Sequence, residues 1–150
     1  MRRAIELSLE NVHTGRGGPF GAVVVQGGAI VGEGANQVLT TNDPSAHAEV
    51  VAIREACRRL GSFQLSGCEI YSSCEPCPMC MGLIYWARPE KVYFANTAED
   101  AAKIGFDDAF IYRELTLPPE KRAIAMQQMM REEAQTAFAA WDKKADKTLY

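Results

Sequence analysis

Apolar positions recur at helical spacing in the first 12 residues and then change to strand-like runs. The apolar stripe predicts a helix over residues 1–12, which the glycines of residues 15–18 end. The stripe consists of Met1, Ile5, Leu9 and Val12. Two runs follow, FGAVVVQ and AIVGEGANQVL, and a Gly-Gly pair at residues 27–28 separates them. They predict the two strands of a β-hairpin.

The middle of the chain alternates between helical and strand patterns. The segment HAEVVAIREACRRL at residues 47–60 predicts a helix with one apolar face, ended by Gly61. That face consists of Ala48, Ala52, Ile53, Ala56, Cys57 and Leu60. CEIYSS predicts a short strand, KVYFA a buried strand, and PMCMGLIYWA between them a helix that we expect to be buried, since it is apolar nearly all round.

Strands that alternate with helices after an opening hairpin indicate an α/β sandwich with a mixed sheet. Residues 96–130 have no clear pattern. Residues 131–150 predict a helix with an apolar stripe, followed by a polar tail that ends in Leu149 and Tyr150. The stripe consists of Ala134, Phe138 and Trp141. We find no repeat, linker or low-complexity tract, so we expect residues 1–150 to form a single domain.

Composition narrows the classes of partner and compartment. A chain of 150 residues with 47% hydrophobic content can bury one core, and its net charge of −3 comes from mixed charges without a basic stripe. We therefore expect no nucleic-acid partner. The N-terminus has neither a signal-peptide nor a membrane-spanning pattern. Five cysteines, an odd number, without an export signal predict a cytoplasmic protein whose clustered cysteines bind metal or react.

Three of the cysteines lie in CEPCPMC, where two prolines separate their roles. Pro78 disfavours helical geometry at Cys77 and itself suits the first helical position. Cys77 therefore caps a helix, and Cys80 follows on nearly the same side of the first turn. Cys74 belongs to the preceding strand, so its geometry is set independently.

His47 is the better candidate for a third ligand, because the other histidine, His13, lies among glycines that end the first helix. His47, Cys77 and Cys80 form the ligand set of a catalytic Zn²⁺ site with an open position for water. Cys74 could formally supply a fourth ligand, but its separate strand disfavours this. Glu49 would lie beside the zinc-bound water without binding the metal and would shuttle its proton.

The pairing of HAE with PCxxC resembles the zinc-dependent nucleobase and nucleoside deaminases. Further stretches, GGPFGAVVV, TNDPSAHAEV, SCEPCPMC, IYWARP and GFDDAFIY, together with a C-terminal tyrosine, are similar to the bacterial guanine deaminases of this superfamily. The resemblance implies a three-layer α/β/α sandwich with a five-stranded mixed sheet, the cytidine deaminase-like fold. It also implies one Zn²⁺ per subunit, conversion of guanine to xanthine and ammonia, and a homodimer that exchanges residues 131–150.

The same resemblance implies a substrate pocket. Phe20 would stack on the purine, Asn36 would read the edge of its ring, and Trp86 would close another wall. Asp108 would accept hydrogen bonds from guanine or help to move a proton, although the adjacent Asp107 is an alternative. The carboxylate of Tyr150 would reach over the partner's pocket.

Other functions stay open from the sequence alone. A deaminase of this fold could act on guanosine, cytosine, an aminotriazine or a tRNA adenosine, although the acidic balance disfavours tRNA. A zinc-stabilised binding module without catalysis is a further alternative. That alternative gives Glu49 no role and would use four protein ligands.

Overall fold

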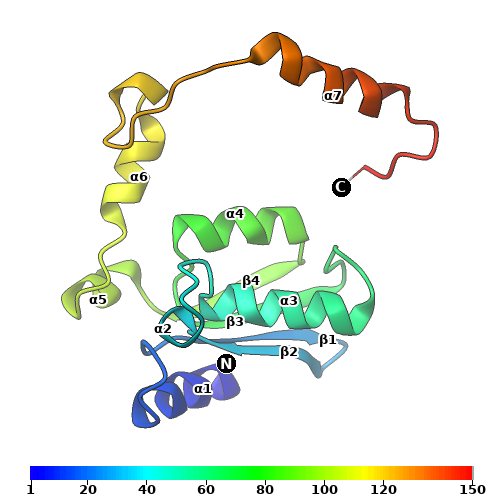
Figure 1. Ribbon diagram of the computed structural model, residues 1–150. Coiled ribbons are helices and arrows are strands. Elements are labelled where there is room, and N and C mark those ends of the chain that lie inside the picture. Colours follow the sequence, from blue (N-terminus) through cyan, green and yellow to red (C-terminus); the bar gives the residue numbers. More distant parts are fainter. Residues whose placement is uncertain (150) are drawn as a thin grey trace. The chain divides into compact units, whose positions relative to one another are not determined.

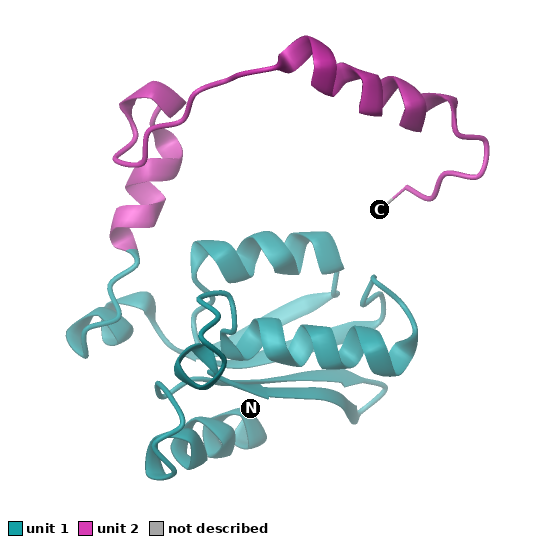
Figure 2. Cartoon of the chain, viewed as in Figure 1, with its two compact units in different colours: residues 1–108 teal, residues 109–150 magenta. Residues whose placement is uncertain are grey.

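The computed structural model describes residues 1–149, and the chain divides into two compact units, residues 1–108 and 109–150 (Figure 2). The strands of the first unit are β1 (Gly21–Gln26), β2 (Ala29–Ala35), β3 (Cys68–Cys74) and β4 (Lys91–Asn96). Its helices are α1 (Arg2–His13), α2 (Val38–Thr41), α3 (Ala48–Leu60), α4 (Pro78–Ala87) and α5 (Ala98–Lys103). The second unit contains α6 (Ala109–Thr116), the short 3₁₀ helix η1 (Pro119–Lys121) and α7 (Arg131–Lys143).

The first unit is a three-layer α/β/α sandwich. Its sheet has the order β2-β1-β3-β4, in which β1 is antiparallel to both neighbours and β3 is parallel to β4. Helix α1 covers one face, and α3 and α4 cover the other (Figure 1). The predicted α/β fold with a mixed sheet is therefore confirmed.

The described residues form four strands in this sheet where we expected five. After β4 the chain enters α5, because Thr97 and Asp100 form a capping box at its start and the following sequence is alanine-rich. A reciprocal cap of this kind satisfies the first backbone N–H groups of a helix. No β-branched run follows in residues 98–108 to extend the sheet.

Helix α3 lies very close to β2, and two glycines make this possible. A Cβ at Gly32 would lie 2.3 Å from the Ala52 carbonyl oxygen, and a Cβ at Gly34 would lie 2.2 Å from that of Ala48. Any other residue at these two positions of β2 would push the helix away. This close approach fixes the N-terminal end of α3, where the predicted metal ligand and base lie.

The buried faces of two helices differ from the sequence predictions. Helix α1 buries the small and polar residues Ala4, Ser8 and Asn11, whereas the predicted apolar stripe is half exposed, as at Leu9 (53%). Helix α4 buries one face, and its Trp86 is 62% exposed, so the prediction of burial all round is wrong. An apolar composition without a clear period indicates a helix but does not select its buried face.

The second unit is rich in exposed apolar side chains. The predicted C-terminal helix is present as α7, and its stripe residues Phe138 and Trp141 are exposed. Apolar residues at helical spacing ordinarily pack against another surface.

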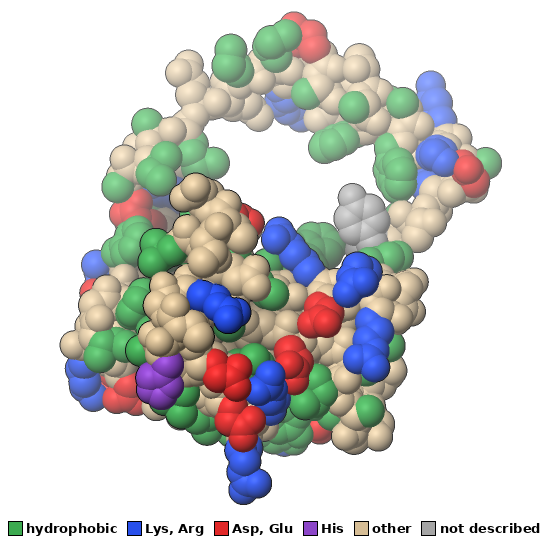
Figure 3. Space-filling view, turned by 60° about the horizontal axis from the view of Figure 1, so that its bottom comes forward, with side chains coloured by type: hydrophobic (Ala, Val, Ile, Leu, Met, Phe, Trp, Pro, Cys, Tyr) green, Lys and Arg blue, Asp and Glu red, His purple; other side chains and the backbone are tan. Residues whose placement is uncertain are grey.

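Charges on the first unit are mixed, as the sequence predicts. Arg3 forms ion pairs with Glu6, Glu10 and Glu33. On the face shown in Figure 3, acidic and basic side chains are interspersed. Among the described residues, none of the helices has both the length and the apolar composition that a bilayer crossing requires.

Candidate functional site

His47 is positioned by the turn that precedes α3. Asp43 accepts hydrogen bonds from the backbone N–H and the hydroxyl of Ser45, and the Ser45 carbonyl in turn accepts one from the His47 N–H at 2.8 Å. His47 has extended backbone geometry at the N-cap of α3, and its carbonyl accepts the first helical hydrogen bond from Val51. An Asx turn of this kind fixes the direction in which a helix begins.

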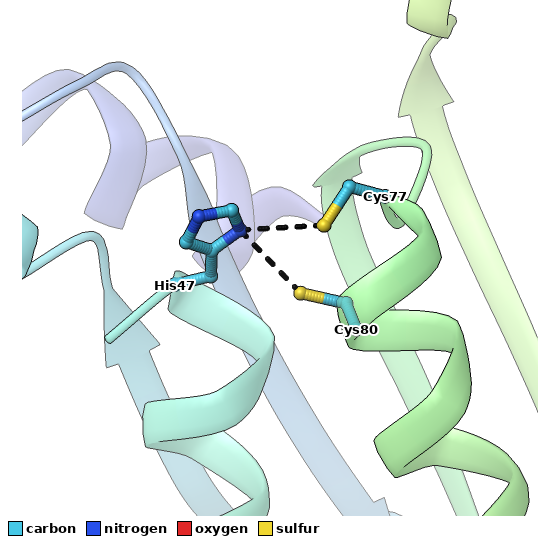
Figure 4. A group of neighbouring side chains, drawn as sticks. All are labelled: His47, Cys77 and Cys80. Atoms are coloured by element: carbon cyan, nitrogen blue, oxygen red, sulfur yellow. Dashed lines mark hydrogen bonds between the residues drawn. The ribbon is translucent and has the colours of Figure 1, made fainter. Parts of the chain in front are cut away.

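Cys77 and Cys80 start α4 as the prolines predict. Cys77 is the N-cap, with Pro78 at the first helical position. Both sulfurs point toward the ring of His47 from the facing helix (Figure 4). The Nδ1 atom of His47 lies 3.5 Å from the sulfur of Cys77 and 3.6 Å from that of Cys80.

This donor set fits Zn²⁺. One ligand atom from each of the three residues lies within 4.8 Å of the others. A tetrahedral zinc ion with sulfur at about 2.3 Å and nitrogen at about 2.0 Å separates those two atoms by roughly 3.5 Å. The observed sulfur–nitrogen distances match that value, so the three side chains are already arranged to bind the metal.

Electrostatics favour thiolate at the start of α4. The hydrogen bond with the Cys80 thiol and the contact with His47 together lower the pKa of Cys77 to about 4, against the opposing effect of burial. The same thiol pair raises the pKa of Cys80, and the hydrogen bond with Cys77 raises the pKa of His47. The lowered pKa of Cys77 favours the thiolate form that a zinc ligand requires.

Glu49 lies in the first turn of α3 and is almost fully buried, at 6% exposure. Burial raises the pKa of its carboxyl above the ordinary value, which makes the carboxylate a stronger base. Its Oε1 accepts a hydrogen bond from the Ser72 hydroxyl on β3 at 3.3 Å. Glu49 is not one of the three grouped metal-binding side chains.

Cys74 lies apart from this group. It is buried at the end of β3, and its sulfur lies 3.6 Å from the carbonyl oxygen of Thr97. Burial raises the pKa of its thiol to about 11, which opposes metal binding as thiolate. Within residues 1–149, Cys74 does not join the ligand cluster.

Phe20 and Asn36 lie at adjacent ends of β1 and β2. The Asn36 backbone N–H donates to the Phe20 carbonyl at 3.1 Å, and Asn11 holds the Asn36 carbonyl from α1 at 2.9 Å. Asn36 is buried, whereas Phe20 is half-buried. The ring of Phe20 meets that of Phe106 edge-on, with centroids 4.9 Å apart. Sequence reasoning missed Phe106, although it lies within the same GFDDAFIY stretch as Asp108.

Of the remaining predicted pocket residues, Asp108 and Trp86 are described by the structure. Asp108 is half-buried, and burial raises the pKa of its carboxyl, whereas Asp107 is exposed. Trp86 lies in the last turn of α4, about 9 Å along the helix axis from Cys80. Tyr150 lies outside the described residues.

Comparison with known proteins also indicates a zinc-binding region in this chain. The profile of the cytidine and deoxycytidylate deaminase zinc-binding region matches residues 1–96. A guanine deaminase of Bacillus subtilis (strain 168) is 54% identical over 150 residues, which cover all of this chain and 96% of that protein. The X-ray structure of guanine deaminase from Bacillus subtilis superposes with a TM-score of 0.97 over 99% of this chain and 95% of that one.

Two further matches are less extensive. A crystal structure of NE0047 in complex with 2,6-diaminopurine has 33% identity and a TM-score of 0.68, over 71% of this chain and 60% of that one. A tRNA-specific adenosine deaminase of Aquifex aeolicus (strain VF5) is 48% identical over 77 residues, about half of each chain. The ligand geometry and the matched profile, which spans more than half of the sequence, lead to one conclusion: the chain belongs to the cytidine and deoxycytidylate deaminase family of zinc-binding proteins.

Proposed function

We propose that this protein hydrolyses guanine to xanthine and ammonia. The observation that carries the proposal is the placement of buried Glu49, whose carboxyl contacts Cys80 and interacts electrostatically with Cys77 and His47, beside the three converging side chains. The full-length similarity to a guanine deaminase selects guanine among the possible bases. A purely structural zinc site would not require a buried carboxylate next to it.

The chemistry divides between the metal and the protein. Bound Zn²⁺ supplies a Lewis acid that makes water easier to deprotonate near neutral pH. Glu49 accepts a proton from the attacking water and delivers it to N3 of guanine as the water oxygen joins C2. The same carboxylate then takes the second proton from this oxygen and delivers it to the amino group, which leaves C2 as ammonia. The oxygen of the water becomes the second carbonyl oxygen of xanthine, so the reaction needs no other co-reactant.

Pocket residues would orient the purine for this attack. Phe20 offers a ring face for stacking, and its edge-on contact with Phe106 holds that ring in place. The Asn36 amide would read the edge of the purine, since it is buried near Phe20 and its backbone is held on both sides. Asp108 would accept from guanine N–H groups, while Trp86 and Tyr150 would complete the pocket walls.

The protein would act as a homodimer that exchanges its C-terminal segment, residues 131–150. Exposed apolar residues in the second unit support this proposal, because they require a packing surface. An exchanged segment would carry the carboxylate of Tyr150 to the partner's pocket. We propose a cytoplasmic location, where a reducing environment keeps Cys77 and Cys80 available for zinc.

The proposed substrate can be tested with the purified zinc-loaded protein. Ammonia release and ultraviolet spectra would be followed with guanine, guanosine, adenine, cytosine and cytidine. Guanine should be consumed with by far the largest kcat/KM. A preference for cytosine or for a nucleoside would reassign the substrate within the family. A tRNA stem-loop is included in the same assay, and preferential deamination of its adenosine would reassign the substrate to tRNA.

A further inference from the structure

One position on β3 breaks an otherwise apolar row beneath the active site. Alternation along this strand turns every second side chain toward α3 and α4, and these side chains are all buried. They belong to Cys68, Ile70, Ser72 and Cys74. The Ser72 side chain contributes the single hydroxyl of the row and is only 2% exposed. Because burying a hydroxyl is unfavourable without a hydrogen-bond partner, its presence there requires an explanation.

The partner of this hydroxyl is the proposed proton carrier. The Ser72 Oγ donates to the Oε1 of Glu49 across 3.3 Å, and the two residues come from different elements, β3 and α3. The distance is long for an O–H···O bond. Catalytic hydrogen bonds are often long before substrate binds and shorten in the complex.

We propose that Ser72 is a positioning residue that orients the Glu49 carboxylate for proton transfer, an inference that rests on the proposed deaminase function. A glutamate side chain has three rotatable bonds, so its carboxylate needs a second contact to hold one orientation. The hydroxyl engages Oε1 from β3, while the carboxyl also contacts its own backbone N–H and the Cys80 thiol. The Ser72 contact thus holds the carboxylate from the side of the sheet. Small errors in such an orientation slow a reaction strongly.

The adjacent Ser73 contacts a different group, so its role differs from the one proposed for Ser72. Ser73 is also buried, but its side chain points to the other face of the sheet, where its hydroxyl accepts from the Gly21 N–H at 3.0 Å. Ser73 thus joins β3 to the start of β1. Ser72, by contrast, has its contact on the catalytic side chain itself.

The competing explanation is that Ser72 only fills space in the core. The variants Ser72→Ala and Ser72→Thr distinguish the two, with Ile70→Val as a control for lost packing on the same strand face. Each would be measured for zinc content, melting temperature, kcat and KM with guanine. We expect Ser72→Ala to lower kcat about tenfold with little change in KM, and Ser72→Thr, which keeps the hydroxyl, to recover much of the loss.

A double-mutant cycle makes the test specific to Glu49. Glu49→Asp shortens the side chain and withdraws the carboxylate from Ser72, so removing the hydroxyl in that background should change kcat by no more than about twofold. An unchanged kcat in Ser72→Ala would overturn the proposal, and so would the same loss with either residue at position 49. An equal kcat loss in Ile70→Val at a matched melting temperature would assign the effect to packing.

Deamination assays of the wild-type protein test the proposed function separately from the role of Ser72. If the wild type does not deaminate guanine, the substrate assignment fails, and the cycle is run with the base that it does deaminate. If the wild type deaminates no base, both proposals fall. If it deaminates guanine and Ser72→Ala does so equally well, only the role of Ser72 is overturned.

Discussion

The Nδ1 atom of His47 lies 3.5 Å from the sulfur of Cys77, although the two residues are 30 positions apart in the chain. Each residue is the N-cap of its helix, so two helix starts meet at one point. The partial positive charge at a helix N-terminus stabilises thiolate. This meeting of α3 and α4 is the structural basis of the zinc site.

Replacement of Glu49 by glutamine should abolish turnover without releasing the metal. The amide keeps the size of the side chain but cannot accept the proton of the attacking water, so kcat should fall by a factor on the order of 10³ or more. Zinc content, measured by atomic emission on dialysed protein, should stay at one per chain. Retained activity would remove Glu49 from the mechanism.

Replacement of Cys80 by alanine should release zinc and lower the thermal stability. The sulfur is one of three grouped ligand atoms, and metal binding contributes to folding. Cys74→Ala is the matched control, because it removes another buried sulfur from outside the cluster. Zinc loss in the control, or a fully metallated Cys80→Ala protein, would show that the ligand set is wrong.

The local sequence carries enough information to predict this site. Within a helix, proline is well tolerated only in the first turn, so Pro78 places the start of α4 at Cys77 and separates Cys77 and Cys80 from Cys74. The helix bearing His47 and Glu49 follows equally from its apolar period and from Gly61, which ends it in left-handed geometry.

Local sequence patterns do not determine how distant elements pack against one another. The apolar stripe of α1 is exposed because Gly21 allows the smaller face, with Ala4 and Ser8, to approach the sheet more closely. The contact between Ser72 and Glu49 depends on how β3 lies under α3. On the strand face that carries Ile70 and Cys74, Ser72 is the single hydroxyl residue, but sequence alone does not identify its partner.

Asp108→Asn should reduce kcat/KM for guanine more than Asp107→Asn does. Asp108 is half-buried with a raised carboxyl pKa, whereas Asp107 is exposed. A loss of about tenfold to a hundredfold is expected for Asp108→Asn, since the amide changes one acceptor oxygen into a donor. Steady-state kinetics on both variants would decide the matter, and a larger effect at Asp107 would transfer the proposed role to that residue.

Deletion of residues 149–150 should impair guanine turnover more than folding, and the defect should be complemented between subunits. Mixing the truncated chain with Glu49→Gln, after partial unfolding and refolding, would give heterodimers with one complete site if the tail acts on its partner. Random pairing then restores roughly a quarter of the wild-type activity. Absence of any recovery, with heterodimers shown by native mass spectrometry, would mean that the tail acts within its own chain or not at all.

The proposed reaction replaces the 2-amino group of guanine by an oxygen atom from water. Mass spectrometry of the product formed in H₂¹⁸O tests it most directly. We expect xanthine with one ¹⁸O atom at C2 and an equal amount of ammonia, both absent with Glu49→Gln. Intact guanine after incubation with the zinc-loaded wild type, or xanthine without the label, would contradict it.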